Sequence, residues 1–598
     1  VLVFLVLLLV ARMFYLQVVQ FERYTTLSNK NRVLVQPIPP TRGLIYDSQG
    51  RLLADNRASQ SLNITLEQAG NLEEIIATIG EIIPVSDNDR ESFAKRLKEP
   101  RRPYQSLPLR YRLTEKEIAK IAVNAYRLPG VSVEAQLVRH YPMQDSTAHV
   151  LGYVGRINEK ELEGIDTAEY AGTDSIGKLG IEKFYEKELL GQVGFQKVEI
   201  NARGRVLRVL ERSAPAPGKD LHLFLDSKLQ EVAEQALDGR RGAVVAIDPQ
   251  SGGILAMVST PSFNPNLFVT GIDVKSYAAL RDSPDLPLFN RAIRGQYPPG
   301  STLKPFVALA GLELGYTDWE HTIYDPGWFQ LSKQGRYYRD WKKYGHGRVN
   351  LEVAIFQSCD TFFYEMAQRI DVDDFHDFLT QFGFGRQTGK DIGEALKGIL
   401  PSSTWKKQSL GEPWYTGDSL NLSIGQGYML ATPLQLATAT AILANRGHWI
   451  APRLVRTASP HQERGEPQPV KPEEPRPTIA DISLGNPKEW EKVIHAMQLV
   501  VHGERGTARR SGLGAKYLMA GKTGTAQVIG IKQDEEYDAD KIAERNKDHG
   551  LFIAFAPVQE PKIAVAVIVE NGGGGSTAAA PVARTVIDAY LLNESGTI

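Results

Sequence analysis

The arrangement of apolar segments in the C-terminal part of the chain constrains its fold most. The segment GAVVAIDPQSGGILAMVS, at 242–259, has two apolar runs around a turn rich in proline and glycine, which is typical of a β-hairpin. Two later runs, LFIAFAP at 551–557 and KIAVAVIVE at 562–570, have the same character, and helical patterns lie between. A sheet that begins at the start of a domain and is completed at its end predicts an α+β fold.

The chain begins with an apolar run, VLVFLVLLLVA, followed by Arg12 and MFYLQVV. We interpret residues 1–19 as a transmembrane signal anchor that is truncated at its start, because a full span needs about 20 residues and no small-residue cleavage site follows. The alternative is a buried helix of a soluble domain. The remaining sequence is soluble in character, which favours one span and a large domain outside the cytoplasm.

The character of the sequence changes near residue 220. Residues 20–219 mix short strand and helix patterns, and no cluster of catalytic residue types stands among them. We interpret them as an elongated pedestal, a dimerisation-type interaction domain, and residues 220–598 as the catalytic domain. The net charge of −1 gives no indication of nucleic-acid binding.

A candidate nucleophile stands in GQYPPGSTLKPFVALAGLELG, at 295–315. Ser301 is placed at the start of a helical pattern, and Lys304 follows one turn later. Ser-x-x-Lys occurs four times in this chain, and serine is also a favourable helix N-cap, so the tetrapeptide alone decides nothing.

Two further short motifs follow in order. Ser358 and Asp360 lie in AIFQSCDTFFYEMA, an apolar, helix-like stretch, and KTGT at 522–525 lies on a strand pattern with a glycine on each side of its lysine. Each motif alone has a structural explanation. Chance rarely assembles all three in this order, with the first on a helix start and the last on a strand.

The three motifs together predict an acyl-transfer site. A serine hydroxyl becomes a nucleophile only when a base takes its proton. Lys304 lies on the same helix face as Ser301, and burial beside a second cation such as Lys522 would lower its pKa enough for it to act as that base. Ser358 would relay the proton to the leaving amine.

The remaining residues of the set suit the substrate. The backbone N–H groups of Ser301 and Thr525 would form an oxyanion hole, and Lys522 with Thr523 would hold a substrate carboxylate. The candidate catalytic residues are Ser301, Lys304, Ser358, Asp360 and Lys522, and the candidate substrate-binding residues are Thr523, Gly524 and Thr525.

This motif set resembles that of the penicillin-binding proteins and serine β-lactamases. TRGLIYDSQGRLLADN and GKLGIEKFYEKELLG resemble pedestal motifs of the class B penicillin-binding proteins, and the likeness to their elongation-specific branch spans nearly the whole chain. The resemblance implies a penicillin-binding transpeptidase fold on a pedestal, and a D,D-transpeptidase that cross-links peptidoglycan stem peptides and is inhibited by β-lactams. It also implies a single-pass protein of the bacterial inner membrane with its catalytic domain in the periplasm. The partners that the resemblance implies are a RodA-type polymerase and an MreC-type scaffold. Most of the superfamily has asparagine where this chain has Asp360.

The only cysteine, Cys359, lies inside the second motif, and a single cysteine forms no intrachain disulfide. Asp325, Asp340 and His346 precede it, and this set of donor types suits tetrahedral zinc, although its spacing matches no common zinc motif. The resemblance implies a structural zinc site on these four residues, while the chemistry itself needs no cofactor. The alternative is a buried thiol beside an ordinary loop.

Two rival functions remain at this level. A D,D-carboxypeptidase or β-lactamase-type hydrolase would need a group that activates water, and we find no Glu-x-x-x-Asn motif between the second and third motifs. A non-catalytic β-lactam sensor or scaffold would also keep Ser301, Lys304, Ser358 and Lys522. Turnover of a stem peptide separates such a sensor from an enzyme.

Overall fold

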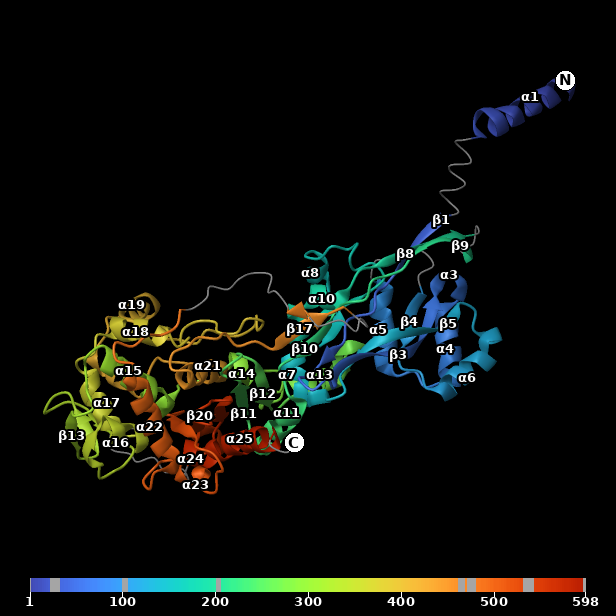
Figure 1. The fold of residues 1–598 in the computed structure, drawn as a ribbon. Coiled ribbons are helices and arrows are strands. Elements are labelled where there is room, and N and C mark those ends of the chain that lie inside the picture. Colours follow the sequence, from blue (N-terminus) through green and yellow to red (C-terminus); the bar gives the residue numbers. More distant parts are fainter. Residues whose placement is uncertain are drawn as a thin grey trace.

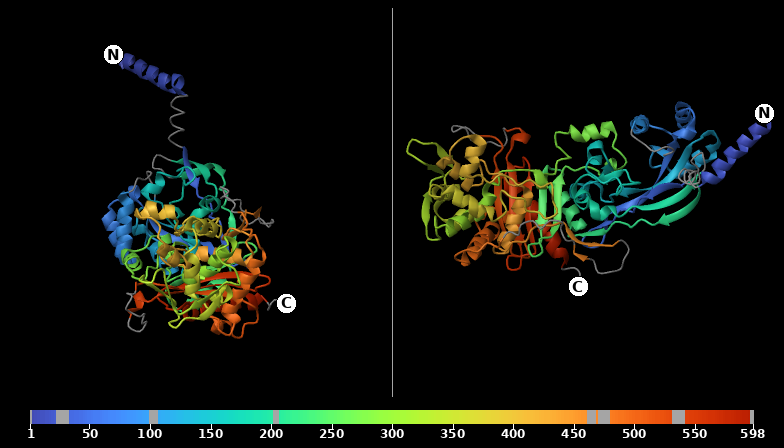
Figure 2. Two further views of the ribbon diagram at one scale, coloured as in Figure 1. Left: turned by 90° about the vertical axis from the view of Figure 1, so that its left-hand side faces the viewer. Right: turned by 90° about the horizontal axis from the view of Figure 1, so that it is seen from above.

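The molecule is elongated (Figure 1). Helix α1, Leu2–Phe14, lies at one end, and the helices and strands of residues 300–380 lie at the other. The view from above keeps this order of parts along the long axis (Figure 2, right). The computed structural model describes residues 2–21, 33–98, 106–200, 206–460, 468–469, 480–530 and 542–594.

The N-terminal apolar run is helical. Helix α1 continues into a π-helical turn, Tyr15–Val19. In the ranges given above, no helix has both the length and the hydropathy required to span a bilayer.

Two structural units make up the pedestal. The first is a three-stranded antiparallel sheet that reaches toward α1, with the order β1 (Val33–Ile38), β8 (Gly194–Ile200), β9 (Val206–Ser213). The second has its own small core, in which the long strand β3 (Leu52–Thr65) pairs with β5 (Val131–His140) and β4 (Ser106–Arg110). Helices α4 (Leu72–Ile82) and α6 (Glu115–Val123) pack on these strands, and the sequences of both have apolar residues with a 3.6-residue period.

The sequence DSQG at 47–50 stands between two apolar runs, a pattern typical of a hairpin turn, and the structure has a turn there. It connects β2 (Ile45–Tyr46) to β3 in an antiparallel pair, and the Asp47 N–H donates to the carbonyl of Arg51 at 2.9 Å. The side chain of Asp47 also accepts from the backbone N–H groups of Gln49 and Arg51, which fixes the turn.

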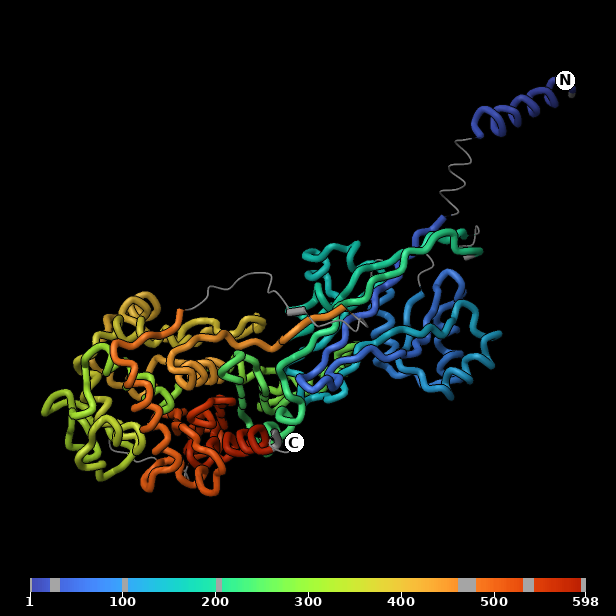
Figure 3. Tube along the Cα trace, viewed as in Figure 1, coloured from blue at the N-terminus to red at the C-terminus, as the bar shows by residue number. Residues whose placement is uncertain are grey.

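One sheet contains strands from both the pedestal and the later chain. Strand β10 (Asp220–Leu223) pairs with β2, and β17 (Val455–Ser459) returns from far along the chain to pair with β10. Figure 3 shows this returning segment in orange beside the green and blue strands. The Tyr185 hydroxyl adds a second tie, because it bonds buried Asp391 at 3.1 Å. The pedestal is therefore attached to the catalytic part through backbone pairing as well as side chains.

The central sheet of the C-terminal part has the predicted composition. Its antiparallel order is β12 (Ile254–Thr260), β11 (Gly242–Ile247), β21 (Ile563–Val569), β20 (His549–Ala556), β19 (Ala520–Ala526). The hairpin near the start of the domain thus joins the strands near its end, which confirms the expected α+β design.

Both faces of this sheet are covered, which explains its continuous apolar strands. Along β11, Ala243 and Val245 face one core, and Val244 and Ala246 face the other. The second face is covered by two helices, α11 (Ser227–Leu237) and α25 (Ala580–Glu594). The first face is covered by helices that include α15 (Lys304–Glu313), α21 (Pro433–Ala444) and α22 (Lys488–His502).

Candidate active site

Ser301 lies in a tight 3₁₀ turn, Gly300–Leu303, that leads directly into α15. The serine is not a helix N-cap: neither the turn nor α15 has a side-chain cap bond, and the residues preceding them already have helical backbone angles. Among the described residues, the Ser301 hydroxyl makes no hydrogen bond, and the side chain is half-buried. The hydroxyl is therefore accessible to a reactant.

Two glycines bring this turn against the edge strand β19. A Cβ added at Gly300 would lie 2.5 Å from the carbonyl oxygen of Thr525, and Gly300 has a φ of 54°. A Cβ added at Gly524 would lie 2.7 Å from Cγ2 of Thr302. Only glycine permits so close a backbone approach. The glycine of Lys-Thr-Gly is thus required by packing, and it sets the Ser301 turn beside Thr525.

The second motif interrupts what the sequence suggested to be a continuous helix. Helix α16 ends at Phe356, and α17 begins at Asp360. Between them Ser358 has a φ of 61°, in the left-handed region that few non-glycine residues adopt. Such strain is typical of functional positions, since the surrounding structure must impose it. The break turns the Ser358 side chain toward the two lysines of the other motifs.

The hydroxyl of Ser358 lies between two fully buried amines. Its Oγ is 2.8 Å from Lys522 Nζ and 3.3 Å from Lys304 Nζ. Lys304 also donates to the Ser358 carbonyl oxygen at 2.7 Å and pairs with Asp360 Oδ1 at 2.7 Å. The three motifs therefore meet at one point.

The helical spacing predicts a hydrogen bond between Lys304 and Ser301, but the structure has none between these two side chains. Its ammonium instead contacts Ser358, Asp360 and the face of Phe363, whose ring centre is 5.2 Å away. The reason is electrostatic, because a buried ammonium is stable only beside a carboxylate or several acceptors.

The electrostatics of the two lysines differ. Burial holds the pKa of Lys522 well below its ordinary value of 10.5, and the charge of Lys304 lowers it further, while Asp360 acts in the opposite direction. Lys304 has a carboxylate partner at 2.7 Å, whereas the bonds of Lys522 to other described residues are to Ser358 Oγ and the carbonyl oxygen of Thr523. The lowered pKa favours the neutral amine of Lys522, and Ser358 connects this amine to Lys304.

The substrate-binding candidates line the open side of the same strand. Thr525 is exposed, whereas Gly524 is buried, and Thr523 Oγ1 lies 2.9 Å from Thr507 Oγ1. Gln426 donates from Nε2 to the Thr525 carbonyl oxygen at 2.9 Å. Neither Thr507 nor Gln426 was recognised in the sequence, since a single side chain on a distant loop has no local pattern.

The four metal-ligand candidates also come together. Asp325 ends β13 (Thr322–Asp325), and its Oδ2 is 2.8 Å from His346 Nδ1 and 3.4 Å from Cys359 Sγ. Asp340 Oδ1 lies 3.5 Å from the same imidazole nitrogen. One potential ligand atom from each of the four residues lies within 4.8 Å of the others, and all four side chains are buried.

These buried acids and the thiol strongly affect one another. Burial raises the pKa of the Cys359 thiol, and the charges of Asp340 and Asp325 raise it further. Burial, with the charge of Asp360, also raises the pKa of Asp340 to about 6. Asp340 Oδ2 accepts from the backbone N–H of Asp360 at 2.7 Å, so this cluster adjoins the catalytic candidates directly.

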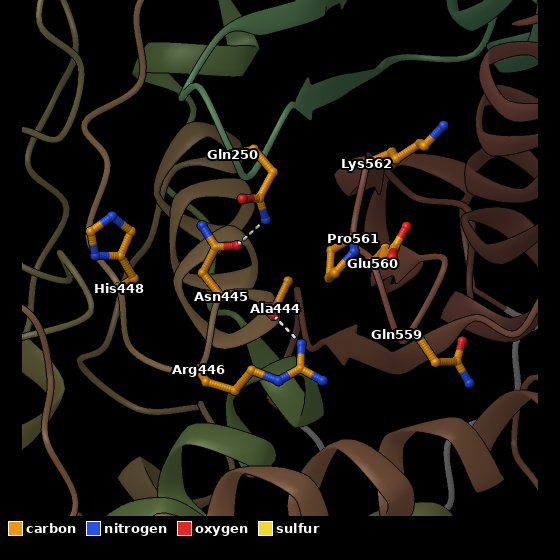
Figure 4. A pocket seen from close by; sticks show the side chains of 9 residues that line it. All are labelled: Gln250, Ala444, Asn445, Arg446, His448, Gln559, Glu560, Pro561 and Lys562. Carbon is orange, nitrogen blue, oxygen red and sulfur yellow. Dashed lines mark hydrogen bonds between the residues drawn. The ribbon is translucent and has the colours of Figure 1, made fainter.

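A separate pocket of about 710 Å³ lies elsewhere on the catalytic part. It opens between the β11–β12 turn, the end of α21 and the β20–β21 turn, with Gln250 and Arg446 among its lining (Figure 4). None of the candidate site residues lines it, so this cavity is distinct from the active site.

A nucleophilic serine, two buried lysines and a bridging serine at the edge of an antiparallel sheet define a serine acyltransferase of the penicillin-binding superfamily. The family model of the penicillin binding protein transpeptidase domain matches residues 242–588, and that of the penicillin-binding protein dimerisation domain matches residues 37–223.

Individual relatives agree with the family models. The peptidoglycan D,D-transpeptidase MrdA of Acinetobacter baumannii is 45% identical over 590 residues, which cover 98% of this chain and 85% of that protein. PBP2 of Helicobacter pylori, solved in complex with MreC, is 29% identical with a TM-score of 0.80, covering 95% and 99% of the two chains. A chain of a peptidoglycan synthase complex is 30% identical with a TM-score of 0.71, covering 98% and 96%. The chain belongs to the class B penicillin-binding proteins, in the MrdA-type PBP2 branch.

Proposed function

We propose that this chain is a serine-type D-Ala-D-Ala transpeptidase that cross-links peptidoglycan stem peptides during cell elongation. The observation that carries the proposal is the Ser358 hydroxyl held between Lys522 and Lys304, and Lys304 follows the accessible Ser301 by one helical turn. This constellation can remove a proton from a serine and return one to a leaving amine. The identity of the MrdA relatives supplies the substrate class.

In the first half-reaction, Ser301 Oγ attacks the carbonyl carbon between the two D-alanines. Lys304 first passes its ammonium proton through Ser358 to the amine of Lys522, and the neutral amine of Lys304 then takes the hydroxyl proton of Ser301. Ser358 returns the proton from Lys522 to the amine of the departing terminal D-alanine, which restores both lysines to their starting states. The backbone N–H groups of Ser301 and Thr525 stabilise the oxyanion. Lys304 must exchange one of its present bonds, to Ser358 or Asp360, before it can reach Ser301.

In the second half-reaction, the amine of a neighbouring stem peptide attacks the acyl-serine ester. A new amide bond forms, the ester bond breaks, and the proton of the amine returns to Ser301 Oγ through the same groups. A β-lactam acylates Ser301 in the same way. Its amide bond opens without release of a leaving group, which explains lasting inhibition.

Covalent labelling tests this function. A fluorescent penicillin incubated with the full chain should give one adduct, on the peptide that contains Ser301, and Ser301→Ala should abolish it. Ser403→Ala is the matched control, because Ser403 and Lys406 form another Ser-x-x-Lys sequence on a helix. An adduct that survives Ser301→Ala would remove Ser301 as the nucleophile.

Turnover then separates transferase from sensor and hydrolase. The chain should release D-alanine from a stem peptide only together with transfer to an acceptor amine. A hydrolase would release D-alanine to water without an acceptor, and a sensor would react once and stop. The MrdA relatives favour transfer.

We also propose that Asp325, Asp340, His346 and Cys359 bind a structural zinc ion. Their fit rests on three observations: the donors lie within 4.8 Å of one another, all are buried, and buried His346 Nε2 has no hydrogen-bond partner among the described residues. A thiolate, an imidazole and two carboxylates suit tetrahedral zinc. A zinc ion would supply positive charge to balance these buried carboxylates and the thiolate. It would also hold residues 322–350 to the start of α17.

We propose a location in the bacterial inner membrane, with the catalytic domain in the periplasm. Helix α1 supports this proposal, because its apolar side chains, such as Val3, Leu7 and Leu9, are more than half exposed. Such a surface is unfavourable in water and favourable in lipid. Fractionation of cells that express the full chain, with protease treatment from the periplasmic side, tests both parts of the proposal.

An MreC-type scaffold and a RodA-type polymerase are the proposed partners. The solved PBP2–MreC complex and the peptidoglycan synthase complex among the similar structures support them. The pedestal is the proposed contact region, since none of the catalytic candidates lies in it. Copurification of each candidate with the full chain, compared with a chain that lacks residues 37–200, tests this assignment.

A further inference from the structure

Residues 322–350 form a distinct lobe at the end of the molecule opposite α1 (Figure 1). Two antiparallel strand pairs build it. The inner pair is the hairpin of β14 (Trp328–Gln330) with β15 (Tyr337–Arg339), and the outer pair is β13 with β16 (Gly347–Asn350). We call these residues the aromatic lobe, because five of its large rings are exposed to an unusual degree. The exposed fractions are 86% for Tyr344, 72% for Tyr324, 61% for Trp341, 47% for Tyr337 and 42% for Trp328.

Exposed rings of this size require an explanation. An aromatic side chain contributes most when it is buried, and gathered exposed rings mark interaction surfaces. Trp328 and Tyr337 already contact each other edge to face, with ring centres 5.0 Å apart. The mechanism described above uses none of these side chains.

The same lobe is strongly basic on its surface. Its only acidic residues, Asp325 and Asp340, are buried in the metal-ligand cluster. The exposed cations of the lobe include Lys333, Arg336, Lys342 and Arg348, and the lobe itself contains no exposed acid.

A groove of about 510 Å³ opens in the lobe. Tyr324, Trp328 and Phe329 supply its apolar walls, Lys333 contributes a cation, and Glu365 of α17 borders it. This volume is within the range of natural ligand pockets. Rings combined with cations suit a ligand that has both flat apolar faces and negative charge.

The lobe is continuous with the active site. The backbone N–H of Trp341 donates to Asp360 Oδ2 at 3.2 Å, and its indole N–H donates to the carbonyl oxygen of Gln357 at 3.2 Å. Trp341 is thus bonded to residues on both sides of Ser358. A ligand on the lobe would therefore lie beside the reacting groups.

We propose that the aromatic lobe binds a glycopeptide strand of peptidoglycan and guides its stem peptide to Ser301. This inference rests on the proposed function. The sugar rings of the strand present apolar C–H faces that stack on tyrosine and tryptophan, and the stem peptides carry carboxylates that pair with lysine and arginine. The place of the lobe, at the opposite end from α1, suits a polymer rather than a membrane component.

Cosedimentation with insoluble, purified peptidoglycan tests the proposal. The full chain is compared with two double variants, Tyr324→Ala with Tyr344→Ala, and Lys333→Gln with Lys342→Gln. The matched controls are Tyr126→Ala, a pedestal tyrosine that is 84% exposed, and Lys160→Gln, an exposed pedestal lysine. Peptidoglycan is used intact and after enzymatic removal of its peptides. The melting temperature of each variant shows whether it is folded. If a double variant does not fold, the two corresponding single variants are tested in its place.

We expect the tyrosine variant to weaken binding to both forms of the polymer by about fivefold or more, as for residues central to an interface. The lysine variant should weaken binding to the intact form only, and high salt should remove that difference. Lobe variants that bind as tightly as Tyr126→Ala and Lys160→Gln overturn the proposal. Because penicillin labelling of Ser301 needs no polymer, it shows separately whether the proposed function has failed.

Discussion

Lys304 Nζ lies 2.7 Å from Asp360 Oδ1, and the lysine side chain is closed to solvent. A paired buried charge is stable only while its partner remains, because the lone ion has no water to replace it. The pair therefore ties the start of α15 to the start of α17, and it fixes Lys304 beside Ser358.

We predict that Asp360→Ala destabilises the chain by about 3–5 kcal/mol, the usual cost of removing one member of a buried ion pair. Asp360→Asn should cost much less, because its amide oxygen still accepts from Lys304. Urea unfolding of the two variants measures the difference. Equal losses for alanine and asparagine would show that the hydrogen bond kept by asparagine contributes nothing measurable, which contradicts the prediction.

Lys522 should make stability depend on pH. Its pKa in the folded chain is well below 10.5 because of burial and the charge of Lys304, so the unfolded chain binds the extra proton between these two pKa values. Stability therefore rises with pH across that window, by about 1.4 kcal/mol per unit for this one group. Lys522→Met should lack this rise, be more stable than the wild type at neutral pH, and lose penicillin acylation.

The measurement is the free energy of unfolding of wild type and Lys522→Met from pH 7 to pH 10, taken as a difference. Lys160→Met, at an exposed position, serves as the control and should follow the wild type. A constant difference between Lys522→Met and the wild type over that range contradicts a depressed pKa at Lys522.

Gly300→Ala should disable the site through contact with β19. The new Cβ would lie 2.5 Å from Thr525 O, so the turn that carries Ser301 must move away from Thr525, which separates the two oxyanion donors. Gly315→Ala is a matched control, since Gly315 has a φ of 74° and open space around it. Both variants carry the left-handed strain of about 1 kcal/mol. Only Gly300→Ala should slow penicillin acylation, by at least tenfold.

Metal removal should loosen the aromatic lobe. A chelator should lower the melting temperature and make Cys359 reactive toward a thiol reagent, because bound zinc contributes directly to folding. His346→Gln should reproduce both effects and reduce the zinc content of the purified chain. His321→Gln is the control, since His321 pairs with Glu365 outside the cluster. A chain without zinc, with unchanged stability in chelator, would refute the metal site.

Local patterns predicted much of the fold. Both hairpin strands at 242–259 and the later strands at 551–570 have the continuous apolar character of a sheet covered on two faces, and their meeting follows from one domain needing one core. Lys522 was also placed correctly on a strand, because glycines and apolar residues flank it.

The interactions within the site could not be predicted in the same way. The break at Ser358 depends on contacts with distant residues that impose a positive φ against an apolar, helix-like sequence. Likewise, Lys304 faces Asp360 rather than Ser301 because burial selects its strongest acceptor, and a sequence does not show which groups lose water together. For residues 322–350 the sequence predicts only metal ligands, because the solvent exposure of the aromatic side chains is a property of the folded chain.

The order of the central sheet also determines when the enzyme can become active. In the part of the chain that the structure describes, the strand that carries Lys522 pairs only with β20, which in turn reaches the opening hairpin through β21. Synthesis runs from the N-terminus, so the serine of the first motif emerges long before these strands exist. Its catalytic partner has no fixed position until residue 569 has been added. A nascent chain is therefore inactive until β21 has been made, and only then can the strand that carries Lys522 join the sheet.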